Sequence, residues 1–256
     1  MVARLSYKQE ITMNKILSVV MLLTISTILY AQKDVTRFLG IPVDGSKSEM
    51  IQKLKAKGYR YNSTLDCLEG EFNGSQVYLS VVTNNNKVWR IAVIDVNDTN
   101  ETNIKIRFNN LCQQFKKNKK YISMEHDYTL AEEEDIERQM LLHKKRYQAA
   151  FYQLPTIIES RANILPDSLR HIVKIMPDDT DQIKVQKYSI NMLLSKYPIE
   201  KINNLTKNEQ EQLVTEMMDS IFKKSVWFMI DKKDYGKYHI KMFYDNEYNH
   251  SNGEDL

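Results

Sequence analysis

The clearest pattern in the chain is an alternation of apolar and polar residues between positions 68 and 95, which predicts three antiparallel strands. Asn73-Gly74 suits a two-residue type I′ turn, which would pair Phe72 with Ser75. A run of asparagines at 84–86 marks the second turn. In this register one face of the sheet is apolar and is expected to form the core: Leu68, Phe72, Val77, Leu79, Val81, Trp89, Ile91 and Val93.

The opposite face of these strands is only partly polar. It carries Tyr78, Val82, Val88 and Arg90, and a mixture of aromatic, aliphatic and arginine side chains is typical of protein interfaces. We therefore expect these four residues to form a binding surface, whereas the alternation assigns Trp89 to the core. The alternative is that another part of the chain covers this face.

Helical spacing and capping signals predict a helix on each side of the strands. Ser46 and Glu49 form a capping box at the start of a helix over residues 47–57. Asp98 and Glu101 repeat the same spacing before a second helix. The apolar residues of this second helix recur at helical intervals: Ile104, Phe108, Leu111, Cys112 and Phe115.

Residues 131–150 fit two different structures. Alternation on either side of residues 143–146 predicts a hairpin with strands at 136–142 and 147–154. Acidic residues at 132–134 would also suit the first turn of a helix, so a helix through 131–150 is the alternative.

The last two strands are expected at 226–231 and 237–245, with a turn at Asp234-Tyr235-Gly236. Residues 155–224 differ in composition, because they contain four of the chain's five prolines. We interpret this region as a helical insertion, with helices near 166–175, 181–196 and 207–223.

This order of elements predicts an α+β fold. Two tandem units of a short helix packed on an antiparallel sheet are expected at 32–97 and 98–256, and the insertion at 155–224 interrupts the second unit.

The N-terminus carries the features of a secretory signal peptide. Sixteen residues without a charge, Ile16 to Ala31, follow Lys15 and precede a polar stretch. We expect translation to start at Met13, residues 1–31 to be removed by cleavage after Ala31, and the protein to be periplasmic or secreted. A membrane span needs about 20 apolar residues, so no stable span is expected after cleavage.

The charge balance argues against a nucleic-acid partner. Without residues 1–31 the chain contains 33 basic and 32 acidic residues. Proteins that bind nucleic acid usually carry a basic excess, because neutralising phosphates supplies much of their affinity.

Sequence motifs for catalysis or cofactor binding are not found. The histidines are scattered, and the sequence contains no zinc motif, nucleophile elbow or phosphate-binding loop. The acidic stretch 95–103 resembles a calcium loop but lacks its glycine and its final glutamate, so helix capping explains it better. We therefore expect no catalytic residues, no metal ligands and no cofactor.

Cys67 and Cys112 allow two interpretations. They could form a disulfide in an oxidising compartment. Alternatively, Cys112 lies on the apolar side of a predicted helix, where a buried free thiol is expected.

Three stretches carry a resemblance: GIPVDGSKSEMIQKLKAKGY, LEGEFNGSQVYLSVV and NNKVWRIAV. Together they resemble a family of secreted bacterial proteins without assigned function. In the order of its elements the chain is similar to the β-lactamase inhibitory protein and to small outer-membrane-assembly lipoproteins. The resemblance implies protein binding across an open sheet, although the chain has no lipobox cysteine and those lipoproteins have no counterpart of 155–224.

These observations favour an exported, non-enzymatic binding protein of the bacterial cell envelope, whose partner is a protein or another envelope component. The alternative is an enzyme that processes envelope glycan or peptide. Such an enzyme would need two carboxylates, or a histidine with an oriented partner, in a cleft between the repeats and the insertion. A third hypothesis is self-association through strand edges, and the sequence leaves the oligomeric state open.

Overall fold

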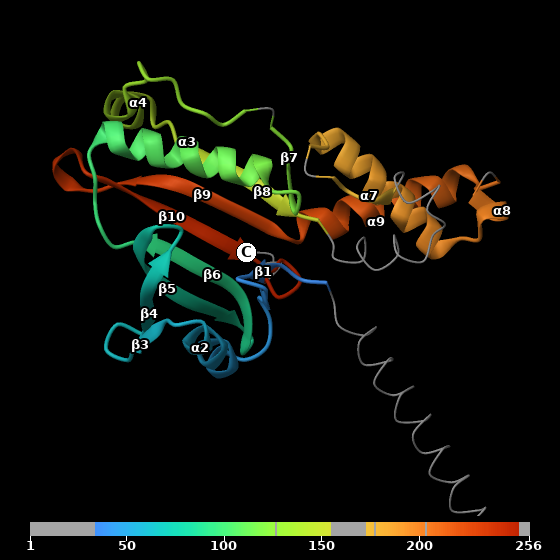
Figure 1. Ribbon diagram of the computed structural model, residues 1–256, viewed down its shortest axis with the longest axis horizontal. Helices are drawn as coiled ribbons and strands as arrows, with labels where there is room; N and C mark the ends of the chain where they lie inside the picture. Colours follow the sequence, from blue (N-terminus) through green and yellow to red (C-terminus); the bar gives the residue numbers. More distant parts are fainter. Residues whose placement is uncertain (1–33, 126, 155–172, 177, 203, 251–256) are drawn as a thin grey trace, which may run out of the picture. The chain divides into compact units, whose positions relative to one another are not determined.

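The computed structural model describes residues 34–125, 127–154, 173–176, 178–202 and 204–250 (Figure 1). Its main feature is an eight-stranded antiparallel sheet in the order β3-β4-β5-β6-β10-β9-β8-β7. The strands are β3 (Arg60–Asn62), β4 (Cys67–Phe72), β5 (Ser75–Asn84), β6 (Lys87–Asp95), β7 (Tyr121–Ser123), β8 (Gln148–Gln153), β9 (Ser225–Lys232) and β10 (Tyr238–Asp245). A separate short hairpin consists of β1 (Arg37–Phe38) and β2 (Ile41–Pro42).

The helices confirm the predicted α+β class. They are α2 (Lys47–Ala56), α3 (Glu101–Lys117), α4 (Ile136–His143), α7 (Asp181–Lys196), α8 (Ile199–Ile202) and α9 (Lys207–Phe222). The predicted signal peptide and the helix expected near 166–175 lie, apart from residues 173–175, outside the described residues.

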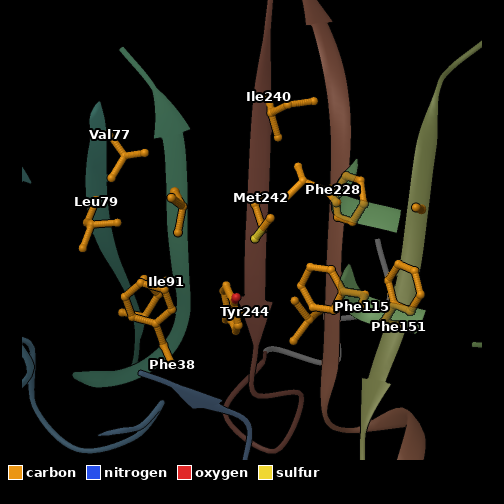
Figure 2. Packing of buried hydrophobic residues seen from close by; sticks show 14 of the residues in the cluster. Phe38, Val77, Leu79, Ile91, Phe115, Phe151, Phe228, Ile240, Met242 and Tyr244 are labelled. Atoms are coloured by element: carbon orange, nitrogen blue, oxygen red, sulfur yellow. The ribbon is translucent and has the colours of Figure 1, made fainter. Parts of the chain in front are cut away.

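The two predicted units share one sheet. β6 of the first unit pairs with β10 of the second, in a register that places Met242 opposite Val93. Side chains from both units therefore belong to one continuous hydrophobic core, which Figure 2 shows from Leu79 through Ile91 and Met242 to Phe151. α2 packs on β5 and β6 through Met50 and Leu54, and α3 packs on β9 and β10.

The predicted hairpin between β4 and β5 is confirmed. Asn73 and Gly74 have φ angles of 50° and 75°, as a type I′ turn requires. Phe72 pairs with Ser75, and the register continues to the pair of Leu68 and Leu79. Val77, Leu79 and Val81 consequently point into the core.

A β-bulge near the start of β6 overturns the predicted positions of two residues. The register shifts between Val82, which pairs with Arg90, and Thr83, which pairs with Val88. Trp89 is thus the extra residue, and the alternation of faces is interrupted there. Val88 was expected on the outer face but is fully buried in the core, whereas Trp89 was expected in the core but is partly exposed.

The observed start of α2 agrees with the prediction from the sequence, and the observed start of α3 does not. The capping box of Ser46 and Glu49 is present. The predicted cap at Asp98 is wrong, because Asn100 caps α3 by accepting a hydrogen bond from the Asn103 amide. Asp98 remains outside the helix, in the segment where Thr99 pairs with Tyr238 of β10.

Residues 131–150 contain one helix and one strand. The predicted strand at 136–142 is wrong, because Asp135 caps α4 by accepting from the Arg138 amide. α4 ends where Lys144 adopts a left-handed conformation with φ 54°. The second predicted strand is present as β8, but it pairs with β7 and β9 instead of with 136–142.

The two long described helices of the insertion, α7 and α9, pack against one end of the sheet. α7 and α9 occupy the predicted ranges and contact each other. Their apolar side chains form a second cluster with Ile122 of β7 and Tyr152 of β8. These two residues pair across the strands and point away from the main core, so α7 and α9 cover the outer face only at its β7–β8 end.

Candidate functional site

The outer face of β5, β6, β10 and β9 forms the candidate site and is called the open face below. α2 and α3 pack on the opposite, core face of these strands, and α7 and α9 contact β7 and β8. Alternation along the strands and the bulge place the following partly exposed residues on the open face: Tyr78, Val82, Trp89, Arg90, Ile94, Trp227, Met229, Lys241 and Phe243.

Arg90 and Asp245 form an ion pair at the centre of this surface. The Nε and Nη2 atoms of Arg90 donate to the two carboxylate oxygens of Asp245 at 2.6 and 2.7 Å. The indole Nε1 of Trp227 donates to the same carboxylate at 2.8 Å. The Asp245 side chain is 2% exposed and that of Arg90 is 23% exposed, so the carboxylate is covered while the guanidinium still reaches solvent.

Aromatic rings surround the Arg90 guanidinium. Its central carbon lies 4.2 Å from the ring centroid of Trp89, 4.7 Å from that of Phe243 and 5.5 Å from that of Trp227. Trp227 and Phe243 stack on each other with their centroids 4.3 Å apart. Distances below about 6 Å are favourable for cation–π attraction. The guanidinium is therefore held by rings as well as by the carboxylate.

This arrangement fixes a donor group on a largely apolar surface. Arginine has five N–H groups, and only those on Nε and Nη2 bond to Asp245. Because two hydrogen bonds and the rings already restrict the side chain, little rotational entropy would be lost on contact with a partner. The surface can therefore donate hydrogen bonds to a carbonyl or carboxylate while the rings bury apolar area.

The structure brings together some of the predicted site residues. Tyr78, Val82 and Arg90 lie on the open face, and Val88 does not, because the bulge buries it. Apart from Trp89, which was expected in the core, sequence reasoning missed the residues that contact Arg90, namely Trp227, Phe243 and Asp245. Their alternation with core residues in β9 and β10 was a usable signal, but the pairing of β10 with β6 was not readable from the sequence.

A hollow on the core side of the sheet is called the cleft below. It has a volume of about 530 Å³ and lies between the end of α2, the end of β4 and the C-terminal half of α3. Among the described residues that line it, Glu71 is the single carboxylate, and no histidine or cysteine is present.

A smaller hollow of about 260 Å³ contains Asp95 and Asp98, which have neighbours of opposite or titratable charge within the fold. Asp95 accepts two hydrogen bonds of 2.6 Å from Arg107 of α3, so it ties β6 to this helix. Asp98 lies 3.4 Å from Nδ1 of His239. Among the described residues, no group of three or more histidine, cysteine or acidic side chains could hold a metal ion.

Both cysteines are buried free thiols in the structure. The structure therefore shows no disulfide between Cys67 and Cys112, and the free-thiol interpretation is the one observed. Burial raises the pKa of the Cys112 thiol to about 12. Burial also raises the pKa of Cys67, and neighbouring acidic residues act in the same direction. A thiol with a raised pKa is a poor nucleophile at neutral pH.

Comparison with known proteins returned no match: no protein-family model, curated protein or solved structure is significantly similar to the chain. Across the described part of the chain, no helix has the length and apolar character needed to cross a membrane.

Proposed function

We propose that this chain is an exported, non-enzymatic binding protein of the bacterial cell envelope that contacts a protein partner through the open face. The observation that carries this proposal is Arg90, held by Asp245 and three aromatic rings on a sheet face that the described helices leave uncovered between β5 and β9.

The composition of the open face supports a protein partner. Tryptophan, tyrosine and arginine are the residues that most often dominate binding energy at protein interfaces. Trp89, Trp227, Tyr78 and Arg90 are all partly exposed here. Lys241 pairs with Asp231 at 2.7 Å, which adds a polar border to the aromatic centre.

The enzyme alternative has weaker support. It requires two available carboxylates, or a histidine with an oriented partner, in a cleft. The described lining of the cleft contributes Glu71 alone, and Asp95 in the smaller hollow is already bound to Arg107. A third hollow, of about 630 Å³, is lined by Glu101, Asp135 and Glu137, and these carboxylates accept hydrogen bonds from the Ile136 amide, the Arg138 amide and Lys232. These observations favour binding over catalysis.

Self-association through strand edges also has weak support. The two outermost strands of the sheet, β3 and β7, are each three residues long. Short edge strands offer few backbone groups to a neighbouring chain.

Export is part of the proposal and rests on the sequence of residues 1–31. The uncharged run from Ile16 to Ala31 after Lys15 is the observation that supports it. Cleavage after Ala31 would give a mature chain that begins at Gln32.

Site-specific photo-crosslinking in cells tests the proposed function. Benzoylphenylalanine is placed at Tyr78 or Met229 on the open face, and at Lys53 of α2 or Gln113 of α3 as exposed controls on the helical side. Discrete adducts with one partner are expected from the open-face positions and not from the controls. The intact mass of the recovered protein checks cleavage after Ala31.

A substitution on the open face makes this test specific. Phe243→Ala removes a ring that stacks on Trp227 and contacts Arg90. Loss of such a residue should reduce the adduct at Met229 about tenfold. Equal adducts from all four positions, or no change in the Phe243→Ala variant, would contradict binding through the open face.

A further inference from the structure

The cleft on the core side of the sheet has the form of a small-molecule pocket. Its floor is apolar and largely aromatic: Phe72, Leu111, Phe115, Met242 and Tyr244. These residues come from β4, α3 and β10, so the pocket exists because the two halves share one sheet. Its volume of about 530 Å³ lies within the range of about 300–1,000 Å³ that is typical of ligand sites.

The rim of the cleft is polar but has no excess of charge. Lys57 and Glu71 contribute one cation and one anion, and neither side chain forms an ion pair with another described residue. Across the mouth, Nδ2 of Asn73 donates to Oε1 of Gln114 at 2.8 Å. This bond links the β4–β5 turn to α3 and shows how closely the two sides approach.

A tyrosine pair supplies a hydrogen-bond donor in the cleft. The Tyr121 oxygen accepts from Nε2 of Gln153 at 3.0 Å, and the hydroxyl of Tyr244 lies near that of Tyr121. Because an amide nitrogen can only donate, this bond does not use the hydroxyl proton of Tyr121, which is left for an acceptor such as a ligand oxygen. Burial raises the pKa of both tyrosines, so both hydroxyls remain protonated at neutral pH.

We propose that the cleft binds a small, uncharged, ring-containing molecule whose carbonyl or ether oxygen accepts the hydrogen bond from Tyr121. This site lies on the opposite side of the sheet from the open face and goes beyond the proposed function. The rings of Phe72, Phe115 and Tyr244 suit a planar apolar body.

The charge distribution selects an uncharged ligand. The floor holds no basic or acidic side chain, so an ion placed there would lose its hydration without gaining a partner. At the rim, Glu71 repels any anion that Lys57 attracts. Lys57 likewise repels any cation that Glu71 attracts. A neutral molecule with one acceptor oxygen meets neither penalty.

Two fluorescent probes test the proposal on the mature chain. Prodan is a neutral naphthalene ketone, and 8-anilinonaphthalene-1-sulfonate is an aromatic anion of similar size. Prodan is expected to bind at one site with a shift of its emission to shorter wavelength, and the anion at least about tenfold more weakly. Tighter binding of the anion, lost in a Lys57→Ala variant, would overturn the uncharged ligand class.

A matched pair of variants on α3 locates the probe. Gln114 and Gln113 are both exposed, but only Gln114 lines the cleft. Gln114→Trp should obstruct the mouth and weaken prodan binding about tenfold or more, whereas Gln113→Trp should leave it unchanged. Equal effects of the two variants would place the probe elsewhere and overturn the proposed site.

The Tyr121→Phe variant tests the hydrogen bond separately. Removal of the donor should weaken prodan binding about fivefold and move its emission further to shorter wavelength, because a neutral hydrogen bond to the ketone is lost. Thermal unfolding of the variant is measured in parallel, and a folded variant with unchanged emission and affinity would overturn the role of Tyr121. Neither result bears on the open face, so the two proposals fail independently.

Discussion

Two buried polar residues near the ends of β10 differ in how well they are partnered. Asp245 accepts hydrogen bonds from Arg90 and Trp227, and both of its oxygens are engaged. His239 is 1% exposed, and its Nδ1 has no hydrogen-bond partner. Burial lowers the pKa of His239 below its ordinary value of 6.5, and the nearby lysines at 233 and 241 act in the same direction. The carboxylates of Asp231 and Asp98 oppose this shift without overcoming it.

This difference predicts a pH dependence of stability. His239 titrates near pH 6.5 in the unfolded chain and at a lower pH in the folded one, so the unfolded state binds more protons between the two pKa values. The contribution of neutral His239 is fully present above pH 6.5 and is lost as the pH falls through the folded pKa. Urea unfolding between about pH 7.5 and about pH 5.5 should therefore show a steeper loss of stability for the wild type than for His239→Gln. Parallel curves for the two proteins would refute this assignment.

At the scale of single elements, the bulge in β6 decides which residues reach the open face. One extra residue in a strand reverses the direction of the side chains beyond it. Val88 enters the core for this reason, and Trp89 instead contacts Arg90 and the ring of His250, at 4.5 Å between centroids. The bulge thus adds an aromatic ring to the open face.

The bulge predicts unequal costs for two valine substitutions in adjacent strands. Val88→Ala should lower the free energy of unfolding by about 2 kcal/mol, because it leaves a cavity in a fully packed core. Val82→Ala, on the partly exposed face, should cost less than about 1 kcal/mol. Denaturant titrations of the two variants make the comparison. A cost at Val88 as small as that at Val82 would mean that β6 follows the simple alternation instead.

At the scale of the whole molecule, the shared sheet joins two regions that resemble separate units in the sequence. The β6–β10 pairing connects them, and the rings of Phe38 and Tyr244 lie 4.8 Å apart in the common core. The second hydrophobic cluster, formed by α7 and α9, is built on β7 and β8 and so depends on the same sheet.

A common core predicts one cooperative unfolding transition for both halves. Trp89 lies in β6 and Trp227 in β9, so each half contains one fluorescent reporter. In Trp227→Phe and in Trp89→Phe, the remaining tryptophan should report the same denaturant midpoint as far-ultraviolet circular dichroism of that same variant. A fluorescence midpoint separated from the circular dichroism midpoint in either variant would show that the halves unfold independently.

Local patterns predicted much of the fold. The type I′ turn at Asn73-Gly74, the capping box at Ser46 and the range of α7 were all readable because they depend on neighbours within a few residues. The prediction of a strand at 136–142 was wrong because the apolar residues of so short a segment fit the period of a helix as well as that of a strand. For the candidate site, the sequence placed Tyr78, Val82 and Arg90 on the correct face. It assigned Trp89 and Val88 to the wrong faces, because the bulge in β6 interrupts the alternation.

Three properties could be predicted from local patterns and composition: the helices and strands with strong hydrophobic periodicity, the near balance of charge, and the mixed character of one sheet face. The pairing of β6 with β10 could be learned from the folded chain alone, and it places Arg90 beside Asp245, a residue 155 positions away. The same pairing brings β4, β10 and α3 around the cleft. Such contacts join residues far apart in the chain, and their energies depend on register and packing that no local pattern records.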